Sequence, residues 1–276
     1  MNVMGKLLTI SAALLVSGTV LGAIGNAMGA RSIYYQDGKL SVGENMGVAV
    51  SSYLMDESDE SAELNLPDQM EVEELELDIG LGELEVIPGK EWSVKGAHLT
   101  QPKQLEYSLY NGELKVRYGI KKNKISGKQF RDKVVVTIPA DCSLRSVVLD
   151  SGVGDVTLRG VKTEKLKLNG GVGDITAQEI QILNNLEVDS GVGDIDLDGV
   201  FRGEVELNGG VGNLQMTLRQ ASEQDYDFDV ESGVGNVQIG EKDLSLFSGE
   251  YEVNQGKENQ ISVDGGVGEI QIRFVP

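Results

Sequence analysis

The chain has little of the chemistry on which the commonest active sites depend. Its 276 residues include one cysteine, Cys142, and one histidine, His98. A single cysteine can build neither an intramolecular disulfide nor a thiolate metal site. A single histidine leaves catalytic triads and histidine-rich metal sites without parts. We therefore expect a protein that is not an enzyme and that holds neither a metal nor a cofactor.

Aromatic residues and positive charges are also scarce. Aromatics make up 5% of the chain, and 24 Lys and Arg stand against 44 Asp and Glu, which gives a formal net charge of -20. Nucleic acid is excluded as a partner, because binding it requires cations that displace counterions. Glycine is abundant, with 36 residues, but it follows no Gly-X-Y period. With few large aromatics, small aliphatic side chains must fill the interior, which favours a thin, repetitive core.

The amino terminus carries the one long apolar run. Residues 7–25, LLTISAALLVSGTVLGAIG, contain no charge, and as a helix they would span roughly 28 Å, close to the thickness of a bilayer. Residues 1–29 are either an uncleaved signal anchor or a signal peptide cleaved after Ala27-Met28-Gly29. Either alternative exports the rest of the chain, as a single-pass protein of the cell membrane or as a secreted one.

Internal repetition is the strongest signal in the chain. Seven segments share the order apolar, polar, small, Gly, Val or Leu, Gly, Asp/Asn/Glu, apolar, any, apolar. They are LDIGLGELEV at 77, LDSGVGDVTL at 149, LNGGVGDITA at 168, VDSGVGDIDL at 188, LNGGVGNLQM at 207, VESGVGNVQI at 230 and VDGGVGEIQI at 263. The spacing is most even over the segments from 149 to 207, and it is widest between the first two.

Each repeat predicts two short strands around a glycine bend. The residues that flank the glycines alternate apolar and polar, as a strand with one buried face does. A period of roughly 20 residues is too short for a helix between strands. We therefore predict an all-β, single-stranded β-solenoid in which strands and valines stack on their equivalents in the next coil. The glycines expected at its structural turns are Gly80, Gly82, Gly152, Gly154, Gly171, Gly173, Gly191, Gly193, Gly210, Gly212, Gly233, Gly235, Gly266 and Gly268.

The residues before the first glycine alternate along the chain. Asp150-Ser151 is followed by Asn169-Gly170, and Asp189-Ser190 by Asn208-Gly209. Two interpretations remain open. If a coil has about 20 residues, the alternation is a remnant of the duplication of a two-repeat unit. If a coil has about 39 residues, each coil contains both kinds of repeat, one at each of its two edges. Contact of Gly152 with Gly171 would support the shorter coil.

The G-x-G-D pattern and the many carboxylates suggest two other interpretations. Calcium-binding β-rolls repeat every nine residues, about half the period seen here, and Asn213 and Asn236 interrupt the acidic position. We therefore read that position as a turn with an exposed polar residue. For glycoside hydrolysis two carboxylates must be singled out, and nothing in this sequence selects a pair.

Charge divides the rest of the chain into regions. Residues 30–66 form an acidic linker, residues 67–140 a variant or capping part of the solenoid, and residues 141–276 its regular repeats. Residues 115–133 hold eight Lys or Arg and one acid, Asp132. This segment is either a docking patch for anionic polymers or lipid headgroups, or it neutralises nearby acidic strands. The candidate patch residues are Lys121, Lys122, Lys124, Lys128 and Arg131.

The repeated small-Gly-x-Gly-Asp/Asn unit behind one hydrophobic segment resembles a bacterial family of putative adhesins with β-strand repeats, a domain of unknown function. The resemblance covers about residues 66–276, and the long gap between the repeats at 77 and 149 departs from an even array. It implies a solenoid on the outer side of a bacterial membrane, often connected with envelope-stress systems, and brings no catalytic residues.

The expected function is a membrane-tethered, extracytoplasmic binding or scaffolding module of the cell envelope. A cell-wall polymer, an anionic lipid or a membrane regulatory protein would be its partner. One alternative is a sensory or regulatory ectodomain of an envelope-stress system. The other is a polysaccharide-active enzyme, which would need a deep groove with Lys or Arg opposite clustered acids.

Overall fold

The computed structural model describes residues 32–36, 39–43, 61–64, 66, 71–119, 131–244 and 250–276. The apolar run at 7–25, and with it the signal anchor or signal peptide expected at residues 1–29, lies outside these ranges. So does most of the acidic linker. Within the described ranges, no helix has both the length and the apolar character needed to cross a bilayer.

The described chain is all-β, as predicted, apart from two single-turn 3-10 helices, η1 (Pro102–Gln104) and η4 (Glu223–Asp225). Strands β1 and β2 form a sheet of their own, and the other twenty strands form one continuous sheet. The strands are β1 (Ser32–Gln36), β2 (Lys39–Gly43), β3 (Ala62–Leu64), β4 (Glu74–Leu81), β5 (Glu83–Gly89), β6 (Ser93–Ala97), β7 (Leu105–Tyr110), β8 (Glu113–Tyr118), β9 (Lys133–Pro139), β10 (Leu144–Val153), β11 (Val156–Arg159), β12 (Lys162–Val172), β13 (Ile175–Val192), β14 (Ile195–Phe201), β15 (Glu204–Val211), β16 (Leu214–Arg219), β17 (Tyr226–Val234), β18 (Val237–Ile239), β19 (Lys242–Asp243), β20 (Glu250–Val253), β21 (Asn259–Val267) and β22 (Ile270–Val275).

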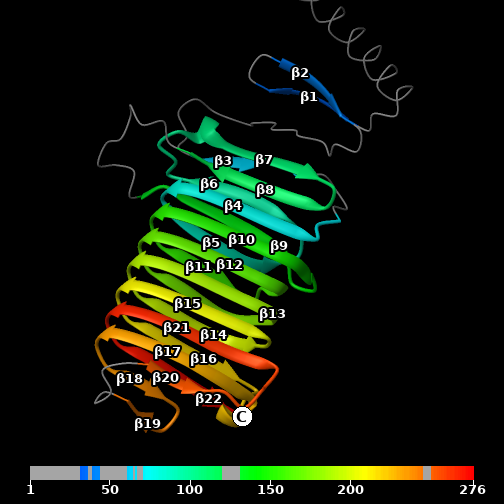
Figure 1. Ribbon diagram of the computed structural model, residues 1–276. Helices are drawn as coiled ribbons and strands as arrows, with labels where there is room; N and C mark the ends of the chain where they lie inside the picture. The colour runs from blue at the N-terminus through cyan, green and yellow to red at the C-terminus, as the bar shows by residue number, and fades with distance from the viewer. Residues whose placement is uncertain are drawn as a thin grey trace, which may run out of the picture.

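The repeats form a stack of rungs, visible as successive parallel arrows in Figure 1. Each rung consists of two strands, and each strand pairs in parallel with its equivalent in the adjacent rung. We number the rungs by their position in the stack. Rung 1 is β8 and β9, rung 2 is β4 and β5, rung 3 is β10 and β11, rung 4 is β12 with the first half of β13, rung 5 is the second half of β13 with β14, rung 6 is β15 and β16, rung 7 is β21 and β22, and rung 8 is β17 and β18.

The register between rungs decides the length of the repeat. Ser151 lies beside Gly170 and Val153 beside Val172, so Gly152 stacks on Gly171 rather than on Gly191. Each rung between 3 and 6 is therefore one repeat of about 20 residues, within the range common in solenoids. The alternative of the longer coil is wrong.

The order of the rungs departs from the order of the chain at both ends. Rung 2, the repeat at 77, pairs directly with rung 3, the repeat at 149, because rung 1 and the strands around it use the intervening chain. At the other end, the last repeat of the chain forms rung 7 and lies between rungs 6 and 8. The expectation that successive repeats always stack on each other is thus wrong for the repeats at 207 and 230, because the repeat at 263 lies between them. The reason is that every rung offers the same register to its neighbours.

The core lies inside the rungs and is aliphatic. In rung 4, Leu166, Leu168, Ile175 and Ala177 are all buried, because they alternate with outward-facing polar residues on the strands. Each such Leu or Ile contributes about 1.5 to 3 kcal/mol by leaving water. The valine between the two glycines behaves differently, since Val172 is 50% exposed. These valines stack on one another as expected, but at the surface and not in the core.

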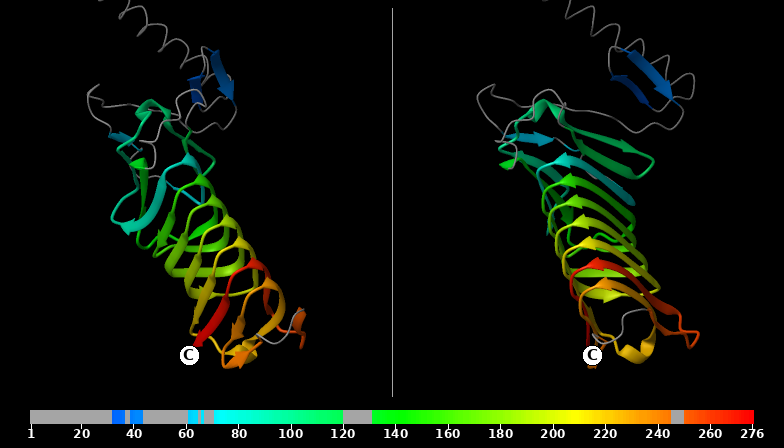
Figure 2. Two further views of the ribbon diagram at one scale, coloured as in Figure 1. Left: turned by 90° about the vertical axis from the view of Figure 1, so that its left-hand side faces the viewer. Right: turned by 60° about the vertical axis from the view of Figure 1, so that its left-hand side comes forward.

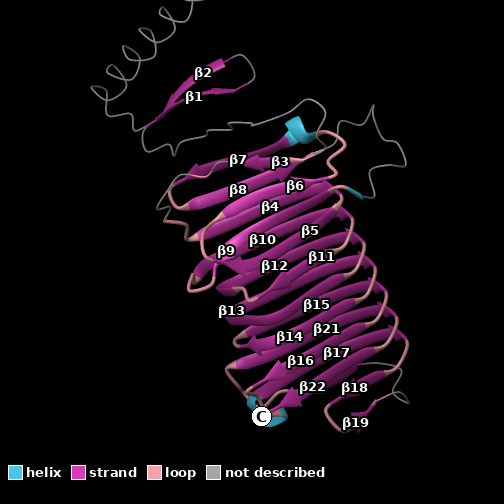
Figure 3. Ribbon diagram, turned by 180° about the vertical axis from the view of Figure 1, so that it is seen from behind, coloured by secondary structure: helices cyan, strands magenta, loops and turns pink. Residues whose placement is uncertain are grey.

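Antiparallel strands cover both ends of the stack (Figures 2 and 3). Strands β7 and β6 pair with the two strands of rung 1, and β3 continues from β6. At the other end, β20 pairs with β17 and β19 with β18. An open parallel edge would template association with other chains, and covering it removes that hazard. Tyr107 of the covering strand β7 and Tyr118 of rung 1 are both buried.

Candidate functional site

A shallow groove runs along the stack where the first strand of each rung meets its glycine bend. Its volume is about 730 Å³. The floor consists of main chain at Gly80, Gly152, Gly171, Gly191 and Gly210, which carry no side chains to fill it. A row of outward-facing polar side chains, one from each of rungs 2 to 7, lines the groove; we call it the polar ladder. Its members are Asp78, Asp150, Asn169, Asp189, Asn208 and Asp264.

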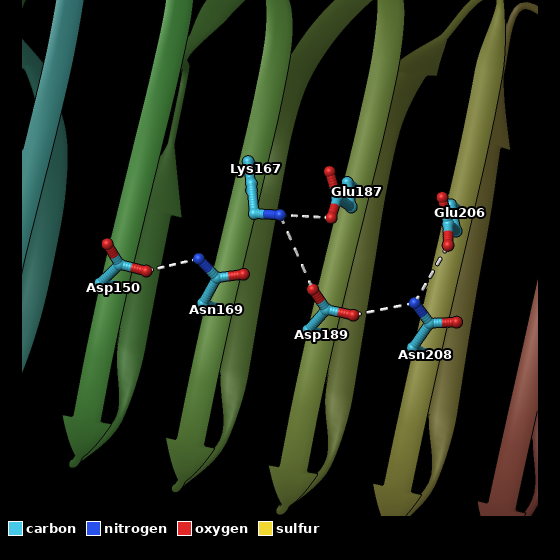
Figure 4. A network of polar contacts seen from close by, with 7 residues as sticks. All are labelled: Asp150, Lys167, Asn169, Glu187, Asp189, Glu206 and Asn208. Carbon is cyan, nitrogen blue, oxygen red and sulfur yellow. Dashed lines mark hydrogen bonds and ion pairs between the residues drawn. The ribbon is translucent and has the colours of Figure 1, made fainter.

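Acid and amide alternate along the polar ladder from rung 3 to rung 7. Figure 4 shows hydrogen bonds between the ladder side chains of rungs 3 and 4 and between those of rungs 5 and 6. The Asn169 amide donates a hydrogen bond to Asp150. The Asn208 amide donates to Asp189 Oδ1 at 2.8 Å and to Glu206 Oε1 at 3.2 Å. Adjacent rungs lie about 4.8 Å apart, so a ladder of acids alone would place like charges next to each other. The amides separate the carboxylates by two rungs and bind them.

Cations partly neutralise the ladder. Lys167 forms an ion pair with Glu187 and reaches Asp189 Oδ2 at 4.0 Å. The hydrogen bond from Lys167 to Glu187 is the main cause that raises the pKa of Lys167 above its usual value. At the rung 1 end, Arg117 Nε lies 3.8 Å from Asp78 Oδ2. The groove is therefore polar and mildly acidic rather than densely charged.

The glycines of the motif are required where the rungs approach each other. A Cβ on Gly171 would lie 2.2 Å from the carbonyl oxygen of Gly152, which is closer than any real contact. Gly173 meets the carbonyl oxygen of Gly154 at 2.3 Å in the same way, and its φ of +142° is one that other residues rarely adopt. The first glycine of the pair is thus needed because the main chain of the neighbouring rung leaves no room for a Cβ. The second is needed for the same reason and because its φ is positive. The predicted turn glycines of the other repeats meet the same close approaches, except Gly80, where a Cβ would lie 3.8 Å from the carbonyl oxygen of Tyr118.

The polar residue after the second glycine satisfies main-chain groups at the bend. Asp174 N–H donates to Asp155 Oδ1 at 3.0 Å, Asp194 N–H to Asp174 Oδ1 at 2.9 Å, and Asn213 N–H to Asp194 Oδ1 at 2.7 Å. Each side chain thus binds the backbone of the next rung where the strand pairing is interrupted. Asn213 performs the same task for Glu269 N–H at 3.1 Å. Asp and Asn are interchangeable here because only one side-chain oxygen is needed.

In two rungs, the glycine before the first motif glycine makes room for the side chain five positions later. A Cβ on Gly170 would lie 2.9 Å from the Cδ1 atom of Ile175. Five residues after Ser151 the chain has Val156, whose side chain is shorter than that of isoleucine. A Cβ on Gly265 would likewise lie 2.4 Å from the Cδ1 atom of Ile270. Ser190 nevertheless precedes Ile195, and a Cβ on Gly209 would meet nothing within 4 Å, so glycine is required in only two of these rungs. Nothing in the sequence pattern indicated this pairing.

Beside the groove runs a row of exposed valines, one at each bend of rungs 3 to 8, which we call the valine ridge. Their exposed fractions range from 37% for Val153 to 69% for Val234. The parallel registers place each valine next to its equivalent in the neighbouring rung. The ridge is a narrow apolar strip between two polar rows, and it borders the glycine floor over the length of the stack.

The basic segment is only partly described. Lys121, Lys122, Lys124 and Lys128 lie outside the described residues, and Arg131 is exposed. Three other cations of the segment pair with acids of rung 2: Lys115 with Glu76, Arg117 with Asp78, and Lys133 with Glu83 and Glu85. These three neutralise neighbouring strands, as one of the two interpretations of the segment predicts.

Both ends of the basic segment are held together by a buried contact. Tyr118 donates a hydrogen bond of 2.6 Å to Asp132 Oδ2, and Thr100 donates to Oδ1 from its hydroxyl at 2.8 Å and its N–H at 3.0 Å. Burial, together with the Asp132 hydrogen bond, raises the pKa of Tyr118 far above its usual value and keeps the phenol a donor. Asp132 is fully buried. The sequence showed it only as one acid among cations.

One family model and several solved structures are similar to this chain. Residues 179–240, less than a quarter of the chain, match the family model described as Toast_rack_N, the N-terminal domain of toast_rack, DUF2154. No curated protein matches. A crystal structure of a putative cell adhesion protein from Clostridium sporogenes ATCC 15579 is 20% identical, with a TM-score of 0.47 over 78% of this chain and 98% of that one. A putative adhesin from Bacteroides fragilis NCTC 9343 is 15% identical, with a TM-score of 0.47 over 77% and 95%.

The predicted resemblance to putative adhesins of unknown function is confirmed.

Proposed function

We propose that this protein is a non-enzymatic binding or scaffolding module on the outer side of a bacterial membrane, tethered through residues 7–25. The apolar length of that run supports the tether. The repeated parallel registers support a β-solenoid that acts as a rod, because each rung buries its core against its neighbours. The groove that the polar ladder lines is the surface that this module would use.

One observation carries this proposal: each of rungs 2 to 7 presents one carboxylate or amide side chain to the groove at the same position. Its polar side chains recur about every 4.8 Å, and its floor is bare main chain. Such a groove has little selectivity for a small ligand that contacts only one rung. A linear polymer, by contrast, can make a similar contact with each rung in turn. Many weak contacts along one chain then combine into a useful affinity. The groove therefore suits an extended polymer lying along the rod.

Charge and geometry narrow the polymer to an uncharged polysaccharide. The net charge of -20 and the carboxylates of the ladder repel anionic polymers. Hydroxyl groups can donate to the ladder acids and accept from its amides, while the valine ridge can contact the C–H faces of sugar rings. The described lining of the groove contains no Lys or Arg, unlike the arrangement expected for a polysaccharide-cleaving enzyme.

The test is binding of the purified chain to uncharged cell-wall glycans, with two matched variants. The ladder variant carries Asp189→Ala and Asn208→Ala, which remove an acid and an amide from rungs 5 and 6. The control carries Asp196→Ala and Gln215→Ala, an exposed acid and amide that are neighbours on the other strand row of the same rungs. We expect the ladder variant to bind at least tenfold more weakly and the control to bind as the unmodified chain does. Equal binding by both variants would remove the groove as the contact.

Ligand length provides a second readout. Six rungs cover about 24 Å between the first and the last ladder residue. Affinity should rise with the number of sugar units until the glycan fills this length and then level off. An affinity that does not change from a disaccharide to a long oligosaccharide would contradict a groove-length contact.

A second surface, the basic segment, has one specific observation in its favour. The Tyr118–Asp132 hydrogen bond joins the two described ends of this segment, and the sequence of residues 119–131 contains five Lys or Arg. Such a cluster would bind anionic lipid headgroups. Neutralising Lys121, Lys122 and Lys124 should weaken binding to vesicles rich in phosphatidylglycerol but leave glycan binding intact. Unchanged vesicle binding would eliminate this segment as a lipid contact.

A further inference from the structure

The stack contains one rung that the chain inserts out of order. After rung 6 the chain passes η4 and builds rung 8, leaving the place of one rung open. It then forms β19 and β20 and returns, so that residues 259–275 fill that place as rung 7. Rungs 6 and 8 thus form the two walls of a slot, and a two-stranded segment occupies it.

The slot recognises its occupant through the repeated motif. In the wall formed by rung 6, Asn208 lies beside Asp264 and Val211 beside Val267. In the wall formed by rung 8, Glu231 lies beside the same Asp264. Both walls therefore present equivalent residues in the same register. Any segment with this motif, in an extended form, can pair with both walls at once.

Contacts at both ends of rung 7 anchor it to these walls. Asn259 Oδ1 accepts a hydrogen bond of 2.9 Å from Gly203 N–H, and Asn259 Nδ2 donates to Asp225 O at 3.2 Å. At the other end, the ring of Phe274 lies 5.9 Å from that of Tyr226 and 6.1 Å from that of Phe228. The anchoring side chains on the occupant thus belong to residues 259–275, and none of them requires the occupant to come from the same molecule.

The connection between rung 8 and rung 7 is long enough to reach another molecule. It runs over residues 240–258 and contains β19 and β20, which pair with rung 8. Once these pairings are released, at about 3.3 Å per residue it can extend to about 60 Å. A second copy of the chain is the one partner certain to carry residues 259–275 with the matching motif. Exchange of identical elements between copies is a route to dimers that needs no new contact surface.

We propose that the slot between rungs 6 and 8 is a strand-acceptor site, and that residues 259–275 of a second copy can fill it in a reciprocal exchange. Such an exchange joins two rods at the ends opposite to rung 1. This dimer goes beyond the proposed glycan binding, since the groove along rungs 2 to 7 has the same lining whether rung 7 comes from the same chain or from the second copy. The protein would thereby link rods that are tethered separately.

The experiment asks whether the rung 7 that pairs with a given rung 6 belongs to the same chain or to a second copy. Two variants of the full chain, in mild detergent and with Cys142→Ser, carry one thiol pair each. One pair is Val211→Cys with Val267→Cys, which reports on the slot; the other is Val192→Cys with Val211→Cys, which lies in rungs 5 and 6. Both pairs are exposed neighbours in adjacent rungs, about 4.8 Å apart, so a short thiol cross-linker bridges them equally well.

Each variant is unfolded, refolded at low or high protein concentration, cross-linked and examined by denaturing gel. At low concentration, both should cross-link within one chain. At high concentration, the Val211–Val267 pair should give a covalent dimer, while the Val192–Val211 pair should still cross-link within one chain. Absence of the covalent dimer from the first variant overturns the exchange. Failure of that pair to cross-link at low concentration overturns the slot itself, and covalent dimers in both variants show random collision instead. Glycan binding of the unmodified chain, refolded at the same two concentrations, tests the groove separately, because the cysteine pairs lie in the valine ridge.

Discussion

Three glycines in one bend of rung 6 separate the two physical demands on the motif. A Cβ added to Gly212 would lie 1.9 Å from the carbonyl oxygen of Gly193, and the φ of Gly212 is +149°. A Cβ on Gly210 would lie 2.1 Å from the carbonyl oxygen of Gly191, but without a positive φ. A Cβ on Gly209 would meet nothing within 4 Å. Alanine at Gly212 therefore tests the close approach and the backbone angle together, and alanine at Gly210 tests the close approach alone. Alanine at Gly209 tests neither and serves as the control.

The expected losses follow from these contacts. An unfavourable backbone angle costs about 1 to 3 kcal/mol, and overpacking against fixed main chain costs about 1 to 3 kcal/mol. Gly212→Ala should thus lower the free energy of unfolding by about 2 to 6 kcal/mol, and Gly210→Ala by about 1 to 3 kcal/mol. Gly209→Ala should change it by no more than about 0.5 kcal/mol. Typical domains have only about 5 to 15 kcal/mol in total, so the first substitution removes a large share.

Thermal unfolding followed by circular dichroism gives the comparison. For a chain of this size a loss of 1 kcal/mol lowers the Tm by about 2 to 4 °C, so Gly212→Ala should lower it by at least about 4 °C. Gly209→Ala should leave it nearly unchanged. The order Gly212, Gly210, Gly209 is the test. Equal losses at Gly209 and Gly212 would show that glycine is needed for chain flexibility and not for the close stacking of rungs.

Three further predictions concern single polar contacts. Asp194→Ala removes the acceptor for Asn213 N–H and should lower the free energy of unfolding, measured by urea titration, by about 1 kcal/mol. Asp194→Asn keeps an oxygen there and should be nearly neutral. Equal losses in the two variants would contradict the role of this side chain at the bend. Tyr118→Phe leaves the buried Asp132 carboxyl with fewer donors and should cost about 1 to 3 kcal/mol in the same titration, and an unchanged midpoint would refute the clamp. Burial would raise the pKa of Asp227, but three backbone N–H groups of the loop after β20 outweigh it and lower that pKa. The ionised Asp227 should therefore stabilise the fold above about pH 4, and this contribution should disappear as the pH falls through the lowered pKa. Melting curves from pH 6 to pH 2 should show that the Tm of Asp227→Asn falls less with acid than that of the unmodified chain. An identical fall in Tm would contradict this.

The local structure could be read from the residues alone. The period-two alternation in segments such as Leu166-Lys167-Leu168 predicts strands, and the paired glycines predict the bends, because both are short-range demands on the backbone. The short period of the repeats predicts parallel pairing between them. The exposure of Val172 and its equivalents was not predicted, because the pattern alone cannot tell on which side of a bend a side chain points.

The candidate site was harder to predict. The alternation of Asp150, Asn169, Asp189 and Asn208 was visible in the sequence, but its cause is contact between side chains that lie one full repeat apart in the chain. Asp132 looked like one acid in a basic segment, and only folding brings it to Tyr118 and buries it. The pattern of residue types along the chain does not show which of these side chains will touch.

The sequence by itself determined that each repeat is a strand, a glycine bend and a second strand with one aliphatic face, since these depend on neighbours along the chain. Only the tertiary structure decided the order of the rungs. Every repeat presents the same register, so the motif at 263 could pair equally well with several others, and sequence spacing does not choose among them. Covering both ends of the stack, with the chain returning from rung 8 to fill rung 7, made that choice.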